Sequence, residues 1–166
     1  NDCTTEKICS ACGAIEEGSA KQHVYNSNYV CENCGQKDPT AVWSKVNISD
    51  IKSTDIVIIV WTTSNGTSYA MSNDNGTGSA PAAKLVTIDE GKLSGDIADN
   101  IKWNIVNNNG NLTIYPNGTT ATWLYCTSTN NGVRVGTNAN KIFTIDTSSG
   151  YLKHTGTNRY LGVYTT

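Results

Sequence analysis

Charge of one sign and long apolar runs are both scarce in this sequence of 166 residues. Twelve Lys and Arg stand against fourteen Asp and Glu, which leaves a formal net charge of −2. A protein that neutralises a nucleic-acid backbone or an anionic membrane needs clustered cations, so this balance argues against either partner. The longest apolar run, residues 56–61, is far shorter than the roughly 20 residues that span a bilayer. We therefore expect no nucleic-acid binding and no membrane insertion.

Long helix-forming stretches are also missing, and only a short helix around residues 94–100 is expected. Asn, Ser, Thr and Gly are abundant instead. They suit short strands joined by many turns, because Asn and Gly tolerate positive φ and hydroxyls bond nearby backbone. The composition favours an all-β fold and is similar to that of secreted bacterial surface domains. A start at Asn1 rather than Met agrees with a mature secreted or trimmed chain, so we expect an extracellular or cell-surface location.

The familiar catalytic sequence patterns are absent. The chain has no G-x-S-x-G turn, no phosphate-binding loop and no dinucleotide-binding fingerprint. Its two histidines, His23 and His154, stand in different parts of the chain. Cys126 follows Tyr125 in an expected strand, where a small residue packed in the interior is the simplest interpretation. We expect no enzyme activity.

The composition of the chain changes near residue 40. Residues 1–40 contain five of the six cysteines, and six acidic residues against three lysines. Residues 41–166 contain nearly all the runs of β-branched residues. Pro39, between them, favours a turn because it cannot continue regular backbone hydrogen bonding. We expect a small N-terminal domain of residues 1–40 and a β domain of residues 41–166.

Two C-x2-C-G knuckles dominate the N-terminal part, with 18 residues between the two cysteine pairs. Their cysteines are Cys9, Cys12, Cys31 and Cys34. The two-residue gap lets both thiolates of one tight turn reach one ion, and the glycine accepts the left-handed conformation that follows. Two such knuckles complete a tetrahedron, so the spacing predicts one zinc ion bound by all four thiolates. About 40 residues bury too little apolar area to fold alone, which makes this ion a structural one.

Over this pattern, residues 7–36 resemble the zinc-ribbon family. The resemblance implies a closed metal site without a catalytic position. A pair of disulfides is the alternative, and an extracellular setting favours it. His23, between the knuckles, could replace one thiolate, although a histidine there also suits an exposed loop.

The C-terminal part contains an internal repeat with an offset of about 40 residues. Trp103 aligns with Phe143, and seven residues later each copy has a glycine, Gly110 or Gly150. A leucine follows two residues after each glycine. A weaker first copy has its turn around Gly66. The glycines are expected in the turns that connect paired strands.

Three such units, each with four short strands, resemble the β-trefoil superfamily. The resemblance implies a pseudo-threefold barrel, whose closure protects strand edges that Thr and Asn side chains cannot protect. Together with the composition, residues 41–166 resemble a β-trefoil-like domain of secreted bacterial surface proteins. A two-sheet β-sandwich is the alternative fold.

Eleven strands are expected in the β domain, one fewer than three complete units require. They cover residues 42–46, 55–62, 68–72, 83–88, 102–106, 111–115, 123–127, 132–137, 141–146, 150–154 and 159–165. The missing strand indicates either a trimmed chain or a strand supplied by a neighbouring molecule. The second case predicts self-association into a homopolymer, an extracellular fibre assembled by strand exchange between copies.

Aromatic side chains are the candidates for ligand binding. A sugar lays one face of its ring on an aromatic side chain and places its hydroxyls against polar groups. Strand alternation points Tyr115 and Tyr164 away from the interior, and Asn117 lies on the turn beside Tyr115. These three residues are the predicted ligand-binding set. The leading function is a non-catalytic glycan-binding or adhesive surface module.

Three further aromatic residues, Tyr69, Trp123 and Tyr160, recur once in each repeat unit. They form either equivalent ligand pockets or apolar caps on the hairpins. The Gln-x-Trp repeat of trefoil lectins is absent, so the trefoil resemblance alone implies no particular lectin site.

Overall fold

The chain folds almost entirely into short strands. The computed structural model describes residues 4–12, 14–20, 22–26, 29–36, 38, 40–94, 97–127 and 130–163. Strands make up 39% of the structure and helices 4%, the latter as the 3-10 turns η1 (Ile48–Asp50) and η2 (Asp99–Ile101). No helix in these residues has the length and apolar character needed to cross a membrane. The all-β class expected from the composition is confirmed.

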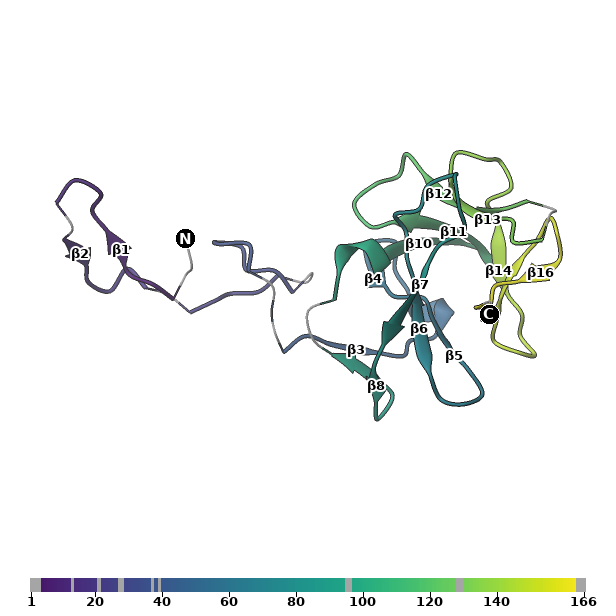
Figure 1. Cartoon of the computed structure of the whole chain (residues 1–166), viewed down its shortest axis with the longest axis horizontal. Helices are drawn as coiled ribbons and strands as arrows, with labels where there is room; N and C mark the ends of the chain where they lie inside the picture. The colour runs from purple at the N-terminus through teal and green to yellow at the C-terminus, as the bar shows by residue number, and fades with distance from the viewer. Residues whose placement is uncertain are drawn as a thin grey trace. The chain divides into compact units, whose positions relative to one another are not determined.

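The chain divides into two compact units. The first comprises the described residues up to Val42 together with Ser94, and the second contains the rest, from Trp43 onward. The boundary lies inside strand β3 (Val42–Ser44; Figure 1). The change in composition near residue 40 therefore occurs close to the boundary between the units.

Regular structure is sparse in the N-terminal unit. Its hairpin consists of β1 (Lys7–Ile8) and β2 (Ile15–Glu16), which are antiparallel. Ile8 and Ile15 are 63% and 58% exposed, so the hairpin contributes little apolar burial. A unit of this size with exposed apolar side chains needs another source of stability.

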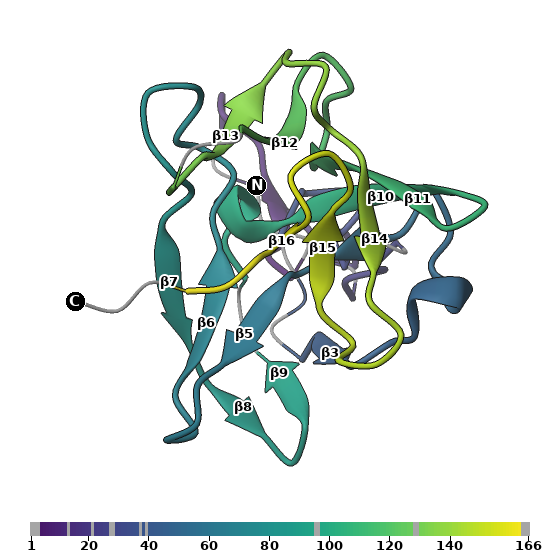
Figure 2. The same ribbon diagram turned by 90° about the vertical axis from the view of Figure 1, so that its right-hand side faces the viewer.

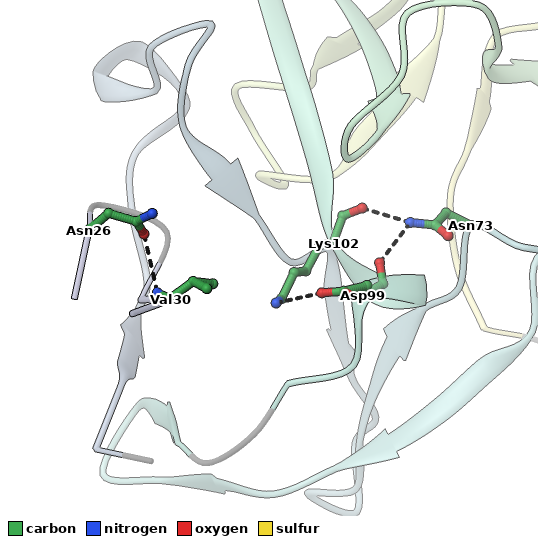
Figure 3. Close-up of polar contacts among 5 residues, drawn as sticks. All are labelled: Asn26, Val30, Asn73, Asp99 and Lys102. Atoms are coloured by element: carbon green, nitrogen blue, oxygen red, sulfur yellow. Dashed lines mark hydrogen bonds and ion pairs between the residues drawn. The ribbon is translucent and has the colours of Figure 1, made fainter. Parts of the chain in front are cut away.

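The second half of this unit is held by local turns. An isolated bridge joins Tyr25 to Cys31. The Val30 backbone N–H donates to the Asn26 side-chain oxygen at 3.2 Å (Figure 3). These contacts bring the chain before the second knuckle back against the knuckle itself.

The second unit is built around one six-stranded sheet, with three smaller sheets. The large sheet has the order β16-β15-β14-β11-β10-β4. Its strands are β4 (Ile56–Val57), β10 (Trp103–Asn108), β11 (Asn111–Pro116), β14 (Phe143–Ile145), β15 (Leu152–His154) and β16 (Arg159–Tyr160). The smaller sheets are β5 (Val60–Thr62), β6 (Ser68–Met71) and β7 (Ala83–Val86); β12 (Trp123–Cys126) and β13 (Val133–Gly136); and β3 with β8 (Ile88–Asp89) and β9 (Lys92–Ser94).

The closed barrel implied by the trefoil resemblance is not formed by the described strands. The expected strand at residues 55–62 shows the reason, because its pairing changes in the middle. β4 pairs with β10 in the large sheet, whereas β5 pairs with β6. Between them, the Ile59 carbonyl oxygen accepts a hydrogen bond from Met71 N at 3.0 Å. Side-chain packing between separate sheets replaces a continuous ladder.

One expected element is only partly formed, and one hairpin was not expected. Of the helix expected around residues 94–100, the described part of that stretch contains only the start of the 3-10 helix η2 at Asp99, and Ser94 ends β9. The unexpected hairpin joins β8 to β9 through Glu90 and Gly91, whose φ values are 46° and 75°. Two consecutive residues with positive φ form the turn that best suits a tight hairpin.

The repeat predicted from the sequence corresponds to repeated hairpins. Gly66, Gly110 and Gly150 have φ values of 87°, 86° and 73°, and they precede β6, β11 and β15 respectively. Trp103 and Phe143, the aligned aromatic residues, are both completely buried. The turn positions and the core aromatic positions of the repeat are therefore confirmed.

The core of this unit lies on one face of the large sheet and beneath the β12–β13 hairpin. Its buried members are Trp103, Ile105, Leu112, Ile114, Leu124, Cys126, Val135 and Phe143. The Trp103 indole N–H donates to the Met71 carbonyl oxygen at 3.0 Å, so this buried polar group is satisfied.

A buried lysine strengthens the region around η2. The Lys102 ammonium lies 2.9 Å from the Asp99 carboxylate, and the Asn73 side-chain amide donates to the Lys102 carbonyl oxygen at 2.7 Å (Figure 3). Because Lys102 is only 7% exposed, its partners reduce the cost of burying its charge.

Candidate metal centre and aromatic surface

Both cysteine knuckles close through the same backbone hydrogen bond. The Cys9 N–H donates to the Ala14 carbonyl oxygen at 2.8 Å, and the Cys31 N–H donates to the Gln36 carbonyl oxygen at 2.7 Å. In the second knuckle, Gly35 has a φ of 77° and donates to the Cys31 carbonyl oxygen at 2.8 Å. The left-handed glycine predicted there is confirmed, whereas Gly13 lies outside the described residues.

Three potential metal ligands converge at the second knuckle. The ligand atoms of His23, Cys31 and Cys34 all lie within 4.8 Å of one another. The Cys34 sulfur and the His23 Nδ1 atom are 3.5 Å apart. A tetrahedral zinc ion with Zn–S of ~2.3 Å and Zn–N of ~2.1 Å separates these two atoms by about 3.6 Å. The group therefore fits a metal ion that prefers sulfur and imidazole ligands.

The surroundings hold this group in place. Cys31 is 1% exposed, and the imidazole of His23 stacks on the ring of Tyr25 with 5.6 Å between centroids. A side-chain hydrogen bond with Cys31 raises the pKa of His23; desolvation opposes this effect and Cys34 adds to it. The bridge between Tyr25 and Cys31 thus positions both the stacked histidine and the buried thiol.

The first knuckle lies outside the three-residue group. Cys9 and Cys12 are exposed and adjacent, and a hydrogen bond from the Cys12 side chain lowers the pKa of Cys9. A lowered pKa favours the thiolate, the form that binds metals. The five cysteines that the structure describes form no disulfide with one another, and Cys3 lies outside the described residues. Convergence of all four knuckle cysteines on one ion stays a prediction.

His23 shows where sequence reasoning was incomplete. A histidine between two knuckles is an obvious substitute ligand, but its spacing does not say whether the ring turns toward the thiols. The signal that could have supported it is Tyr25, an aromatic residue two positions later that provides a surface for the ring.

The predicted ligand-binding residues are placed as follows. Tyr115 is half-buried on β11, opposite in direction to the buried Leu112 and Ile114, as the alternation predicted. Its ring meets the edge of Trp123 at 6.5 Å between centroids and 83°. Asn117 is half-buried, and its N–H donates to the Lys102 carbonyl oxygen at 3.0 Å. Tyr164 lies outside the described residues.

The rings beside Tyr115 are partly covered. The Lys141 ammonium lies 4.0 Å from the centroid of Trp123, and the Trp123 indole N–H donates to the Asn138 carbonyl oxygen at 2.6 Å. A cation on the ring face competes with a sugar for that face. Trp123 therefore presents less free aromatic surface than its sequence position suggests.

A more open aromatic cluster lies elsewhere on the second unit. Trp61 and Tyr151 are 4.9 Å apart between centroids and tilted by 49°, and Tyr151 meets Tyr160 at 6.5 Å and 79°. Tyr151 is 46% exposed and Tyr160 is 50% exposed. Tyr160 is recognisable from the sequence as a repeated position, whereas Tyr151 and Trp61 are not, because no periodic signal connects them.

A hydrogen-bonded carboxylate orients one ring of this cluster. The Tyr160 hydroxyl donates to Asp146 at 2.6 Å, and the same carboxylate accepts hydrogen bonds from the backbone N–H groups of Ser148 and Ser149 at 2.9 and 3.0 Å. Hydrogen bonds from the side chain of Ser148 and from Tyr160 hold the pKa of Asp146 well below its usual range. The bond to Asp146 also raises the pKa of Tyr160. The ring of Tyr160 is therefore held in place before any ligand arrives.

Comparison with known proteins adds no relative to these observations. No protein-family model matches the chain. No curated protein and no solved structure matches it significantly. The zinc-ribbon and β-trefoil resemblances therefore remain expectations drawn from the chain's own residues.

Proposed function

We propose that this chain is a non-catalytic module, extracellular or displayed on a cell surface, whose β unit binds glycans. The observation that carries this proposal is the cluster of the half-buried Trp61 with the exposed Tyr151 and Tyr160. Sugar rings have apolar C–H faces that stack on aromatic rings, and their hydroxyls bond to nearby polar groups. We further propose that nucleic acids are not ligands and that the chain does not insert into membranes.

Two features favour a glycan over another apolar ligand. A polar group borders the rings, since the Asp146 carboxylate accepts the hydrogen bond of the Tyr160 hydroxyl. The cluster is also on the surface, whereas pockets for wholly apolar ligands enclose most of the ligand. An ordered aromatic platform loses little conformational entropy on binding, which raises affinity for a flexible chain.

Removing the central ring should weaken binding. Tyr151→Ala is expected to raise the Kd about tenfold, because a lost stacking contact costs on the order of 1.5 kcal/mol. Affinity electrophoresis in gels containing xylan, galactomannan, laminarin or hydroxyethyl cellulose measures this, and titration calorimetry on the retained polysaccharide gives the Kd. Tyr160→Phe keeps the ring but loses the hydrogen bond to Asp146, so it should weaken binding less than Tyr151→Ala does.

Two outcomes contradict this assignment. No retardation by any polysaccharide, with the β unit folded, ends the glycan proposal. Binding that survives Tyr151→Ala but is lost in Tyr115→Ala or Asn117→Ala places the site at the residues first predicted from strand alternation.

For the N-terminal unit we propose a structural zinc ion. Three ligands are His23, Cys31 and Cys34; their ligand atoms lie within 4.8 Å of one another, and the 3.5 Å between Cys34 Sγ and His23 Nδ1 suits tetrahedral coordination. The first knuckle, with Cys9 and Cys12, is the source of any further thiolate. When bound, the ion supplies the cross-link that the exposed apolar side chains of this unit do not.

A second candidate function is that of a fibre subunit assembled by strand exchange. The observation in its favour is that β16, with both residues exposed, lies at the edge of the six-stranded sheet in the described part of the chain. An edge strand can add a strand from another molecule. Sedimentation velocity over a range of concentrations tests this: polymers support it, and a single monomeric species at every concentration excludes it.

A further inference from the structure

The open aromatic cluster continues across a neighbouring sheet. In the β5–β6–β7 sheet, Trp61 pairs directly with Tyr69, and Tyr69 pairs directly with Leu85. Residues opposite each other on antiparallel strands point to the same face. The alternate positions of β6, Ser68 and Ala70, are 5% and 0% exposed and so point to the interior. Trp61, Tyr69 and Leu85 therefore form a row on the other face.

This row and the ring cluster share Trp61. From Trp61 the contacts pass to Tyr151 and then to Tyr160, and Figure 2 shows β15 and β16 beside the β5–β6–β7 sheet. We name the five residues Leu85, Tyr69, Trp61, Tyr151 and Tyr160 the aromatic strip. Leu85, at its far end, is 72% exposed. Tyr151 and Tyr160 are also exposed, and Trp61 and Tyr69 are half-buried. Apolar side chains that are connected in this way mark a binding surface more often than single exposed ones do.

The rings of the strip do not share a plane. Trp61 and Tyr151 are inclined by 49°, and Tyr151 and Tyr160 by 79°. A flat crystalline polysaccharide surface can stack on several rings only when those rings are coplanar. A single chain differs, because rotation about its glycosidic bonds lets successive sugars face rings of different inclination.

We propose that the aromatic strip binds one soluble glycan chain along several consecutive sugars, and not the surface of a crystalline polysaccharide. This inference rests on the proposed glycan-binding function and specifies the form of its ligand. Tyr151 and Trp61 form the central subsite. Tyr160, held by Asp146, forms one end, and Tyr69 with Leu85 forms the other.

The length of the chain should control its affinity. A series of oligosaccharides, from disaccharide to hexasaccharide, is prepared from whichever soluble polysaccharide retards the protein in the gel. Titration calorimetry then gives the Kd of each. Affinity should rise with length until the strip is filled. Leu85→Ser should weaken binding of the longest oligosaccharide about three- to tenfold, because it removes apolar contact at one end. It should leave the shortest oligosaccharide unaffected.

A matched variant separates the strip from general surface effects. Val106 on β10 is also an exposed apolar residue, 39% exposed, and lies outside the strip. Val106→Ser should bind every oligosaccharide with the wild-type Kd. Tyr151→Ala should weaken all lengths alike, because every ligand uses the central subsite.

The failure of this inference can be told apart from failure of the glycan function. Retention on microcrystalline cellulose or chitin with no length dependence for soluble chains overturns the inference and leaves glycan binding intact. Equal effects of Leu85→Ser and Val106→Ser also overturn it. If Leu85→Ser changes the sedimentation coefficient but leaves glycan binding unchanged, the strip is an interface between copies and the inference is wrong. Absence of binding to every polysaccharide tested defeats both proposals.

Discussion

Cys31→Ser is expected to abolish zinc binding and to unfold the N-terminal unit, while the β unit remains folded. Cys31 is the buried member of the His23–Cys31–Cys34 group, so a solvent molecule cannot replace its thiolate as a ligand. Structural zinc contributes on the order of 10–16 kcal/mol in small zinc domains, about as much as the whole stability of many folded proteins. The β unit should be insensitive because it has its own buried core.

Elemental analysis of zinc per chain and resolved amide NMR signals from each unit check this result. Cys126→Ser is the matched control, because Cys126 lies in the core of the other unit and should leave zinc content unchanged. Withdrawal of the metal with a chelator should reproduce the effect of Cys31→Ser. Full zinc content in Cys31→Ser contradicts the assignment, and an intact mass lower by the hydrogens of paired thiols supports disulfides instead.

The same measurement separates the two possible ligand sets. If His23, Cys31 and Cys34 bind the ion, His23→Ala should weaken zinc binding about as strongly as Cys34→Ser. If the four knuckle cysteines bind it, His23→Ala should weaken zinc binding only as the loss of an outer neighbour does, much less than Cys34→Ser, and Cys9→Ser or Cys12→Ser should weaken it about as strongly as Cys34→Ser. Loss of an outer neighbour typically lowers the metal affinity by about 10- to 100-fold. This effect is easily distinguished from the larger effect of losing a ligand.

The second large effect is expected at His154, a buried histidine on β15. It is 1% exposed, and its ring lies 5.1 Å from that of Phe143 between centroids. Nε2 lies 2.9 Å from the Asn140 carbonyl oxygen, whereas Nδ1 accepts from the Thr157 backbone N–H at 3.1 Å. The neutral ring with its hydrogen on Nε2 satisfies both partners, so His154 connects β15 to two loops.

His154→Ala should lower the free energy of unfolding of the β unit by about 2–4 kcal/mol. It leaves a cavity against Phe143 and removes the hydrogen bonds that the ring makes with the Asn140 carbonyl oxygen and the Thr157 N–H. Urea unfolding followed by tryptophan fluorescence measures the change. Lys153→Ala, at the neighbouring and half-exposed position on β15, should change the midpoint little. An unchanged midpoint for His154→Ala means that the loops satisfy these groups in another way.

Local chemistry explains what could be predicted from the sequence. Gly66, Gly110 and Gly150 all adopt the positive φ that their turn positions require, because a turn depends on a few adjacent residues. All eleven strands expected in the β domain have a counterpart, since alternation reports which residues face the interior. The two knuckles were likewise recognisable from spacing alone, and both close through equivalent hydrogen bonds.

Only the tertiary structure decided which of these local pieces meet. The break at Ile59, which sends β4 and β5 to different sheets, depends on strands β10 and β6 that lie far along the chain. The contact of Trp61 with Tyr151 joins residues with no shared period, and the turn of His23 toward Cys31 and Cys34 depends on packing against Tyr25. Sequence by itself determined the class, the turns and the candidate thiols, because these follow from neighbouring residues. The composition of both candidate sites depended on long-range side-chain contacts, and a linear pattern does not encode their directions.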